Sequence, residues 1–296
     1  MASPQRCAEA AVPDWLNELD ADQELSLTRS RSELNALPVA GPLQDATVAG
    51  DDPSSPKLMS GDCDSARPQT DVIPGYLQQT YWWAYVHPRA VRFFERQWLV
   101  NLILWGNFDR LRNAALDALG RRIGGRTLQI ACVYGNFTAT LVGRLVPGAS
   151  LDVVDVLPIQ LQNLRTKLPV SSPVTLHQCD SMALNFRNGT YDQAVLFFLL
   201  HEQPANVRSR TLGEALRVVK PGGKLVVVDY HRPGWWHPLR YLFEPVLRAL
   251  EPYAMDLWNH EMTKWLPESF PADHIQKRNY YGGLYQELII TVPAHT

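Results

Sequence analysis

The 296-residue sequence predicts a doubly wound α/β domain, with helices on both faces of a mostly parallel sheet and an antiparallel C-terminal hairpin. Three observations predict this fold. Residues 127–155 read as a short apolar strand, a glycine-containing turn, a helical stretch and a second apolar strand ending in Asp155. Apolar runs and helical stretches then continue to alternate up to Tyr230. Finally, two strand-like runs flank Gly282-Gly283, which predicts a hairpin with a two-residue turn.

The two ends of the chain differ in composition. The chain has 30 acidic and 28 basic residues. Residues 1–70 contain 12 of the acids and 5 of the bases, so residues 71–296 contain 18 acids and 23 bases. Residues 1–70 are also rich in Ser, Pro, Asp and Gln, so we expect a disordered tail. The excess of base in residues 71–296 suits the anionic surface of a membrane. No block rich in Lys and Arg points to nucleic acid.

The cysteines and the apolar runs favour a cytoplasmic protein. The four cysteines have no C-x-x-C spacing, which is typical of a reducing compartment. The N-terminus carries early acids and no apolar stretch of the signal-peptide kind. No apolar run reaches the ~18 residues that a membrane-spanning helix needs. We therefore expect cytoplasmic localisation with peripheral association at the inner membrane surface.

Residues 71–126 predict a helical cap ahead of the first strand. Pro88 suits a first helical turn, and after it apolar and basic residues recur on two different faces. The apolar positions are Val91, Phe94, Trp98 and Leu102, and the basic positions are Arg89, Arg92 and Arg96. This helix either covers the core or lies on a membrane surface over a lipophilic pocket. Asn107 can cap the next helix, which we expect to end at Gly124-Gly125.

The turn after the first strand departs from the glycine pattern of nucleotide-binding turns. Gln129 stands where an acid is usual, and Ala131 and Val133 stand where glycines are usual, so that only Gly135 remains. Val133 and Tyr134 fill the space that the tail of a ligand would use. The turn is therefore either degenerate and non-binding, or one that redirects that tail.

Polar side chains follow several strands at the sheet edge where ligands bind in such folds. Asp155 comes about 20 residues after the turn, where an acid binds the hydroxyls of a ribose. His201-Glu202-Gln203 follows the fourth strand, and Asp229-Tyr230-His231 ends the fifth. His201, Glu202, Asp229 and His231 are a set of ligands compatible with Mn²⁺ or Mg²⁺. His201 could instead act as a general base, or each residue could only orient a loop.

These motifs together resemble the class I S-adenosylmethionine (SAM)-dependent methyltransferases. Asp155 matches the ribose acid of that family, Asp180-Ser181 matches the adenine contact, and residues 219–225, VKPGGKL, match the loop before its fifth strand. The resemblance implies a SAM-binding domain over residues 127–296, with a helical insertion at 232–270. The expected cofactor residues are Gln129, Ala131, Val133, Tyr134, Gly135, Asp155, Val156, Asp180 and Ser181.

A closer resemblance, over residues 72–292, is to the rhodoquinone biosynthesis protein RquA family, a divergent branch of those methyltransferases. It is carried by IPGYLQQTYWWAYVHPRAVRFFERQWL, QIACVYGNFT, DVVDVLPIQL, FFLLHEQP and VDYHRP. It implies conversion of ubiquinone to rhodoquinone, in which an amino group from SAM replaces a ring methoxy group, with manganese present. We then expect Tyr134, His201, Glu202 and His231 to carry the chemistry. Two alternatives stay open: a conventional methyltransferase acting on a lipophilic ring, and a non-catalytic subunit that binds quinone.

Overall fold

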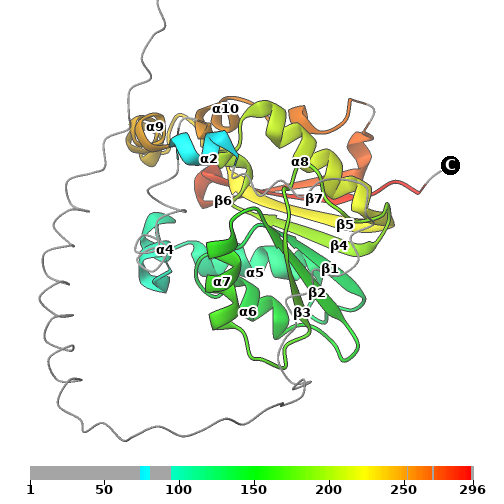
Figure 1. Cartoon of the computed structure of the whole chain (residues 1–296). Coiled ribbons are helices and arrows are strands. Elements are labelled where there is room, and N and C mark those ends of the chain that lie inside the picture. Colours follow the sequence, from blue (N-terminus) through cyan, green and yellow to red (C-terminus); the bar gives the residue numbers. More distant parts are fainter. Residues whose placement is uncertain (1–73, 81–94, 252, 269, 295–296) are drawn as a thin grey trace, which may run out of the picture. The chain divides into compact units, whose positions relative to one another are not determined.

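The computed structural model describes residues 74–80, 95–251, 253–268 and 270–294 (Figure 1). Within these ranges seven strands form one sheet in the order β3-β2-β1-β4-β5-β7-β6. The strands are β1 (Arg126–Ile130), β2 (Ser150–Asp155), β3 (Val174–Gln178), β4 (Tyr191–Phe197), β5 (Val219–Tyr230), β6 (Ile275–Tyr280) and β7 (Tyr285–Thr291). The first five are parallel, and β7 runs antiparallel to both of its neighbours. The predicted fold class is confirmed.

Helices cover both faces of the sheet (Figure 1). On one face lie α5 (Phe108–Leu119), α6 (Phe137–Val142) and α7 (Pro158–Lys167), and on the other lies α8 (Ala205–Val218). The insertion after β5 contains α9 (Leu239–Leu250), α10 (Ala254–Asn259) and the 3-10 helix η3 (Met262–Trp265). No helix among the described residues is long and apolar enough to span a bilayer.

The central strand β4 is buried on both faces, as its continuous apolar sequence predicts. Val195 and Phe197 belong to the core cluster shared with α5 and α6. Ala194 and Leu196 belong to the second cluster, which is shared with α8. This double burial fixes the position of the loop after β4, which carries His201.

The C-terminal hairpin is confirmed, but its predicted two-residue turn is wrong. The last strand pair is Tyr280 with Tyr285, so four residues form the loop, including the short 3-10 helix η5 (Tyr281–Gly283). Tyr281 joins Gly282 and Gly283 at positive φ, with a value of 48°. A loop of this length with left-handed residues can still reverse the chain between antiparallel strands.

The N-terminal cap differs from its prediction in two ways. Residues 81–94, with Arg89 and Arg92, lie outside the described residues. The next helix, α4 (Gln97–Ile103), starts only after Arg96, whose backbone is extended. The predicted continuous helix is therefore wrong there. Of the two alternatives for the apolar face, burial against the core does not hold for Trp98 and Leu102, which are 58% and 64% exposed, while Val91 and Phe94 lie outside the described residues.

The helix that follows the cap starts where expected and ends early. Asn107 is the N-cap residue of α5, but its side chain donates back to the carbonyls of Leu104 and Trp105 and makes no cap hydrogen bond. The helix ends at Leu119, because Gly120 takes a φ of 139°. The predicted end at Gly124-Gly125 is therefore wrong.

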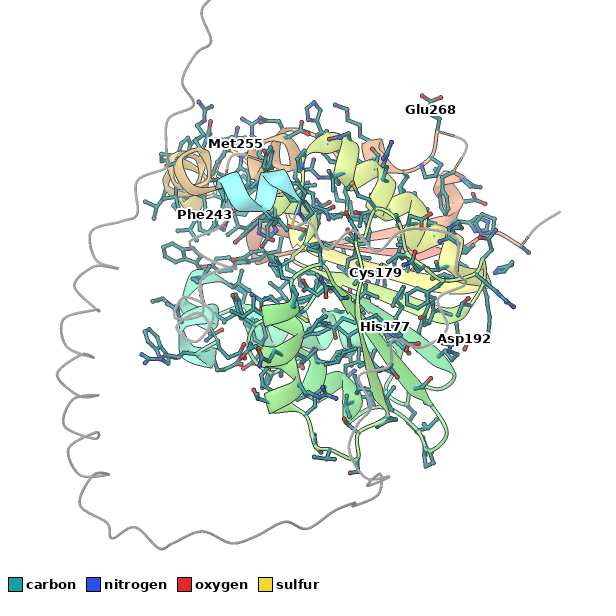
Figure 2. All side chains as sticks on the ribbon, viewed as in Figure 1. His177, Cys179, Asp192, Phe243, Met255 and Glu268 are labelled. Carbon is teal, nitrogen blue, oxygen red and sulfur yellow. The ribbon has the colours of Figure 1, made fainter. Side chains whose placement is uncertain are left out.

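The carboxyl ends of the parallel strands point towards α2 (Gly75–Thr80), α9 and α10 (Figure 1). Figure 2 shows Asp192, the second residue of β4, and Phe243, on α9, at opposite ends of the sheet. The polar residues expected to form the site follow the strands at the α9 end.

Candidate active site

The turn after β1 keeps a glycine-type backbone although glycine is largely missing from it. Ala131 has a φ of 72°, in the left-handed region that costs a residue with a Cβ about 1 kcal/mol. Gly135 has a φ of 77°, and a Cβ there would come within 2.6 Å of Gln97 Oε1. Val133 packs against the α5–α6 core and anchors the turn. Strained backbone such as that at Ala131 is common at binding sites, which makes the turn a candidate for ligand contact.

Gln129 lies beneath this turn and is fully buried. Its Nε2 donates to the carbonyl of Ala131 at 2.9 Å, and its Oε1 accepts from the hydroxyl of Thr138 at 2.9 Å. Because both ends of the amide are used within the protein, Gln129 positions the turn rather than making the expected direct contact with a cofactor.

Asp155 ends β2 and is buried beside the turn. Its Oδ2 accepts from the Cys132 amide and its Oδ1 from the Leu157 amide, both at 2.8 Å. Burial raises the pKa of Asp155 to about 6, although these backbone donors oppose the shift. Each carboxylate oxygen keeps lone pairs, so the ionised group can accept hydrogen bonds from ribose hydroxyls.

Tyr134 lies in the turn and bonds to the neighbouring helix. Its hydroxyl accepts a hydrogen bond from Gln160 Nε2 of α7 at 2.8 Å, so the ring bridges the turn and α7. Burial raises the pKa of Tyr134, and the carboxylates of Glu202, Glu95 and Asp155 raise it further. The Tyr134 hydroxyl therefore lies close to three acids that come from three different segments.

An ion pair not anticipated from the sequence closes the same turn. Lys167 Nζ, at the end of α7, lies 2.7 Å from Glu95 Oε1 and also donates to the carbonyls of Val133 and Gly135. Glu95 Oε1 accepts from the Gly135 amide at 3.0 Å, and its Oε2 accepts from Asn163 at 2.7 Å. The pair is hard to find by pattern, because Glu95 is 40 residues from Gly135 and 72 from Lys167.

Helix α2 covers the loop after β2. Its Leu77 packs against Leu157 and Val156, which puts the expected cofactor residue Val156 in an apolar setting beneath the helix. Burial raises the pKa of the neighbouring Tyr76, and nearby carboxylates, Asp180 first among them, raise it further. Tyr76 is therefore within electrostatic reach of carboxylates that follow the strands.

Asp180 and Ser181, the expected adenine contacts, make mainly internal bonds. Asp180 Oδ1 accepts from the Met182 amide at 2.9 Å, which shapes the loop after β3. Ser181 Oγ lies 2.8 Å from Thr211 Oγ1 and accepts from Gln203 Nε2 at 3.1 Å. The buried Gln203 Oε1 has no hydrogen-bond partner among the described residues, so it is available to a ligand donor such as an adenine amino group.

His201, in the loop after β4, and Asp229, near the end of β5, come together. Nδ1 of His201 lies 2.9 Å from Oδ1 of Asp229, in an oblique ion-pair contact, and Nε2 lies 3.6 Å from Glu202 Oε1. Burial alone would lower the pKa of His201, but the charge of Asp229, followed by Glu202 and Glu251, raises it to about 9. The imidazole is therefore protonated at neutral pH, where it donates rather than accepts, and the expected general-base role does not fit.

The expected Mn²⁺ or Mg²⁺ ligand set is not formed. His231 lies apart from His201, with Nδ1 2.7 Å from the carbonyl of Gly283 and Nε2 3.7 Å from Glu261 Oε1. The Asp229 carboxylate is already bonded to backbone amides of residues 200, 201 and 230. Among the described residues no three His, Cys, Asp or Glu side chains are arranged to hold a metal ion.

A line of aromatic rings leads from His201 towards the surface. Ring centroids are 4.8 Å apart for His201 and Tyr230, 6.1 Å for Tyr230 and Phe243, and 5.8 Å for Phe243 and Trp105. Phe198, just after β4, packs 5.3 Å from Tyr230 and has a φ of 54°. A strained aromatic residue at this point is consistent with a ring-binding site.

Comparison with known proteins agrees with this geometry. A structure of an O-methyltransferase family protein from Burkholderia thailandensis shares the fold, with a TM-score of 0.51 and 17% identity over 70% of this chain and 61% of that one. A family model described as a methyltransferase domain matches residues 127–223. An uncharacterized methyltransferase of Synechocystis is 30% identical over 155 residues, which are 52% of this chain and 68% of the relative.

The chain belongs to the class I SAM-dependent methyltransferase family. Another relative of this methyltransferase, the demethylmenaquinone methyltransferase of Beutenbergia cavernae, is 29% identical over 201 residues, which are 64% of this chain and 80% of the relative. The residues present fit SAM in their chemistry: Asp155 can accept hydrogen bonds from ribose hydroxyls, and Gln203 Oε1, which has no partner among the described residues, can accept one from an adenine amino group.

Proposed function

We propose that this methyltransferase-family protein uses SAM to modify the ring of a polyprenyl quinone, and that it replaces a methoxy group of ubiquinone by an amino group to form rhodoquinone. The single observation that carries the proposal is Tyr134 at the turn, bonded to Gln160 at 2.8 Å. The relative from Beutenbergia is named as a demethylmenaquinone methyltransferase, which supports a quinone as substrate. The similarity of residues 72–292 to the RquA family supports the amino group as the group transferred.

Tyr134 supports amino transfer because of where its ring lies. Glycines at the usual positions of the turn, which are Ala131 and Val133 here, would let the backbone approach the methionine portion of SAM and aim the methyl group at the acceptor. Here Val133 and the neighbouring ring of Tyr134 add bulk to the turn, and the Tyr134 hydroxyl is held on α7. The amino-acid end of SAM must therefore shift, and a shifted end brings the α-amino group, rather than the methyl group, towards the quinone.

His201 and Asp229 would supply the proton chemistry. Addition of an amine to the methoxy-bearing carbon places negative charge on a ring carbonyl oxygen, and the protonated His201 can donate a hydrogen bond to that oxygen. The methoxy group would then leave as methanol with the proton that the amino group gives up. Transfer of the Cα hydrogen of the bound SAM residue to the quinone ring would next give a quinol imine, and hydrolysis of that imine by water would break the nitrogen–Cα bond, leaving the amino group on the ring and releasing the SAM residue as a 2-oxo acid. Asp229, with its carboxylate fixed by backbone amides, holds the imidazole in place and keeps it protonated.

We propose in addition that the protein works at a membrane surface. Exposed apolar side chains from the α4 region, from α9 and from the loop before α9 define what we call the α4–α9 surface: Trp98, Leu102, Ile103, Trp105, Trp235, Trp236, Tyr241, Leu242 and Val246. The contact between Trp105 and Phe243 joins its two halves. Trp235 is 76% exposed, and such tryptophans favour the headgroup region of a bilayer. The aromatic rings lead from this surface to His201, which suits a substrate that stays dissolved in lipid.

Incubation of the purified protein with ubiquinone and SAM, followed by mass spectrometry of the quinone fraction, tests the proposal. We expect a product in which one methoxy group has become an amino group. A matched reaction with a demethyl quinone tests the second candidate, ring C-methylation, which the name of the Beutenbergia relative favours. Methylation of the demethyl quinone without amination of ubiquinone would establish that second function. Loss of product in Asp155→Ala would place either reaction at this site.

A further inference from the structure

The turn that the tail of SAM must approach carries two opposite charges. Glu95 Oε1 accepts from the Gly135 amide at 3.0 Å, and Lys167 Nζ donates to the carbonyls of Val133 and Gly135 at 3.3 and 3.2 Å. The two charged groups lie 2.7 Å apart, and each side chain is about one-fifth exposed. Both charges are thus fixed to the turn and within reach of a ligand.

One face of α7 builds this arrangement. Gln160, Asn163 and Lys167 follow one another at helical spacings of three and four residues, which puts their side chains on one side of the helix. Gln160 binds Tyr134, Asn163 binds Glu95 Oε2, and Lys167 binds Glu95 Oε1. The aromatic ring that blocks the usual path of the tail and the charged pair therefore belong to one assembly.

We infer that Glu95 and Lys167 form the binding site for the α-amino-acid end of SAM, with Glu95 accepting the ammonium group and Lys167 donating to the carboxylate. An α-amino acid carries both charges on one carbon, and the pair presents the two complementary charges side by side. The inference deepens the proposed function, on which it rests, by stating where the tail displaced by Tyr134 goes.

The ion pair between Glu95 and Lys167 is weak enough to be replaced by contacts to SAM. A partly exposed ion pair contributes little to stability, because solvent screens it. Replacing the contact between Glu95 and Lys167 by contacts to a zwitterion therefore costs the fold little. Each residue then keeps a charged partner, and the backbone of the turn remains available for further hydrogen bonds.

Binding measurements with three ligands test the inference. SAM has both charged groups, decarboxylated SAM keeps only the amine, and methylthioadenosine lacks the whole amino-acid end. In Lys167→Met we expect the Kd of SAM to rise about ten- to hundredfold, which is the loss of one charged hydrogen bond. The Kd values of decarboxylated SAM and methylthioadenosine for the variant should lie within about twofold of those for the parent protein. A twofold change in Kd corresponds to less than about half a kcal/mol. Arg165→Met, on the same helix, is the matched control for loss of a positive charge.

Glu95→Gln separates the second contact. The amide side chain keeps the shape of Glu95 and an oxygen for the Gly135 amide but removes the charge. We expect weaker binding of both SAM and decarboxylated SAM, and unchanged binding of methylthioadenosine. Equal changes for all three ligands, or no change for SAM, would overturn the inference and leave the pair a purely structural contact. None of these measurements needs a quinone, so a failure of the proposed quinone chemistry would be seen separately.

Discussion

The Nδ1 atom of His201 lies 2.9 Å from the Oδ1 atom of Asp229, and both groups are buried at the carboxyl ends of adjacent strands. Asp229 also accepts the backbone amides of Leu200 and His201, so the carboxylate fixes the loop and the ring together. The attraction between the imidazolium of His201 and the carboxylate of Asp229 outweighs the cost of burying the charged ring. His201 therefore carries a proton at neutral pH. The contact therefore links the stability of the fold to the protonation of the proposed acid.

This contact predicts a dependence of stability on pH. The pKa of His201 is raised from 6.5 to about 9, so the stabilisation is fully present below pH 6.5 and is lost as the pH rises through 9. We expect the free energy of unfolding to fall by up to about 3 kcal/mol over that window. Denaturant unfolding of Asp229→Asn should show a flatter profile, and the exposed control Asp273→Asn should follow the parent. Parallel profiles for the parent and Asp229→Asn would show that the pair is not linked to folding.

Asp155 predicts a dependence of SAM binding on pH. The pKa of this carboxyl is about 6, and only the ionised form accepts both ribose hydroxyls, so SAM affinity should fall as the pH drops through 6. By calorimetry we expect Asp155→Asn to bind SAM about 1.5–3 kcal/mol more weakly at pH 8 and without this pH dependence. Asp192→Asn, at the opposite end of the sheet, is the control (Figure 2). An Asp155→Asn protein with parental affinity would exclude the ribose role.

The side chains of the turn are expected to decide which group of SAM is used. Replacing Val133 and Tyr134 together by glycine should preserve SAM binding and abolish amination, because the tail can then return to the usual path. Tyr134→Phe keeps the ring and removes the hydroxyl that binds Gln160, so it should retain most of the amination. If the double glycine variant aminates ubiquinone as well as the parent does, the turn is not the determinant.

The α4–α9 surface predicts peripheral membrane binding. Trp235→Ser combined with Trp236→Ser should weaken sedimentation with anionic vesicles at least about tenfold, because each exposed indole contributes on the order of 1 kcal/mol at the interface. Val170→Ser removes an equally exposed apolar side chain elsewhere and should change nothing. High salt should release part of the bound protein. Sedimentation that is the same in both variants would argue against this surface.

Local patterns predicted much of the fold and part of the site. The continuous apolar run of β4 and the acid at the end of β2 are signals within a few residues, and both are found where expected. His231 could not be placed in this way, because its position depends on the distant C-terminal hairpin. The backbone amide of His231 donates to the carbonyl of Leu284, just before β7. Glu95 was missed for the same reason, since its partners are distant in sequence and only the packed fold brings them together.

One measurement tests the central claim most directly: incubation with ubiquinone and SAM labelled with ¹⁵N in its α-amino group and ¹³C in its methyl group, followed by mass spectrometry of the quinone. With the tail displaced by Tyr134, the product should carry ¹⁵N on the ring in place of a methoxy group and no ¹³C. A product that carries the ¹³C-methyl group and no ¹⁵N would contradict the account and make this chain a conventional quinone methyltransferase.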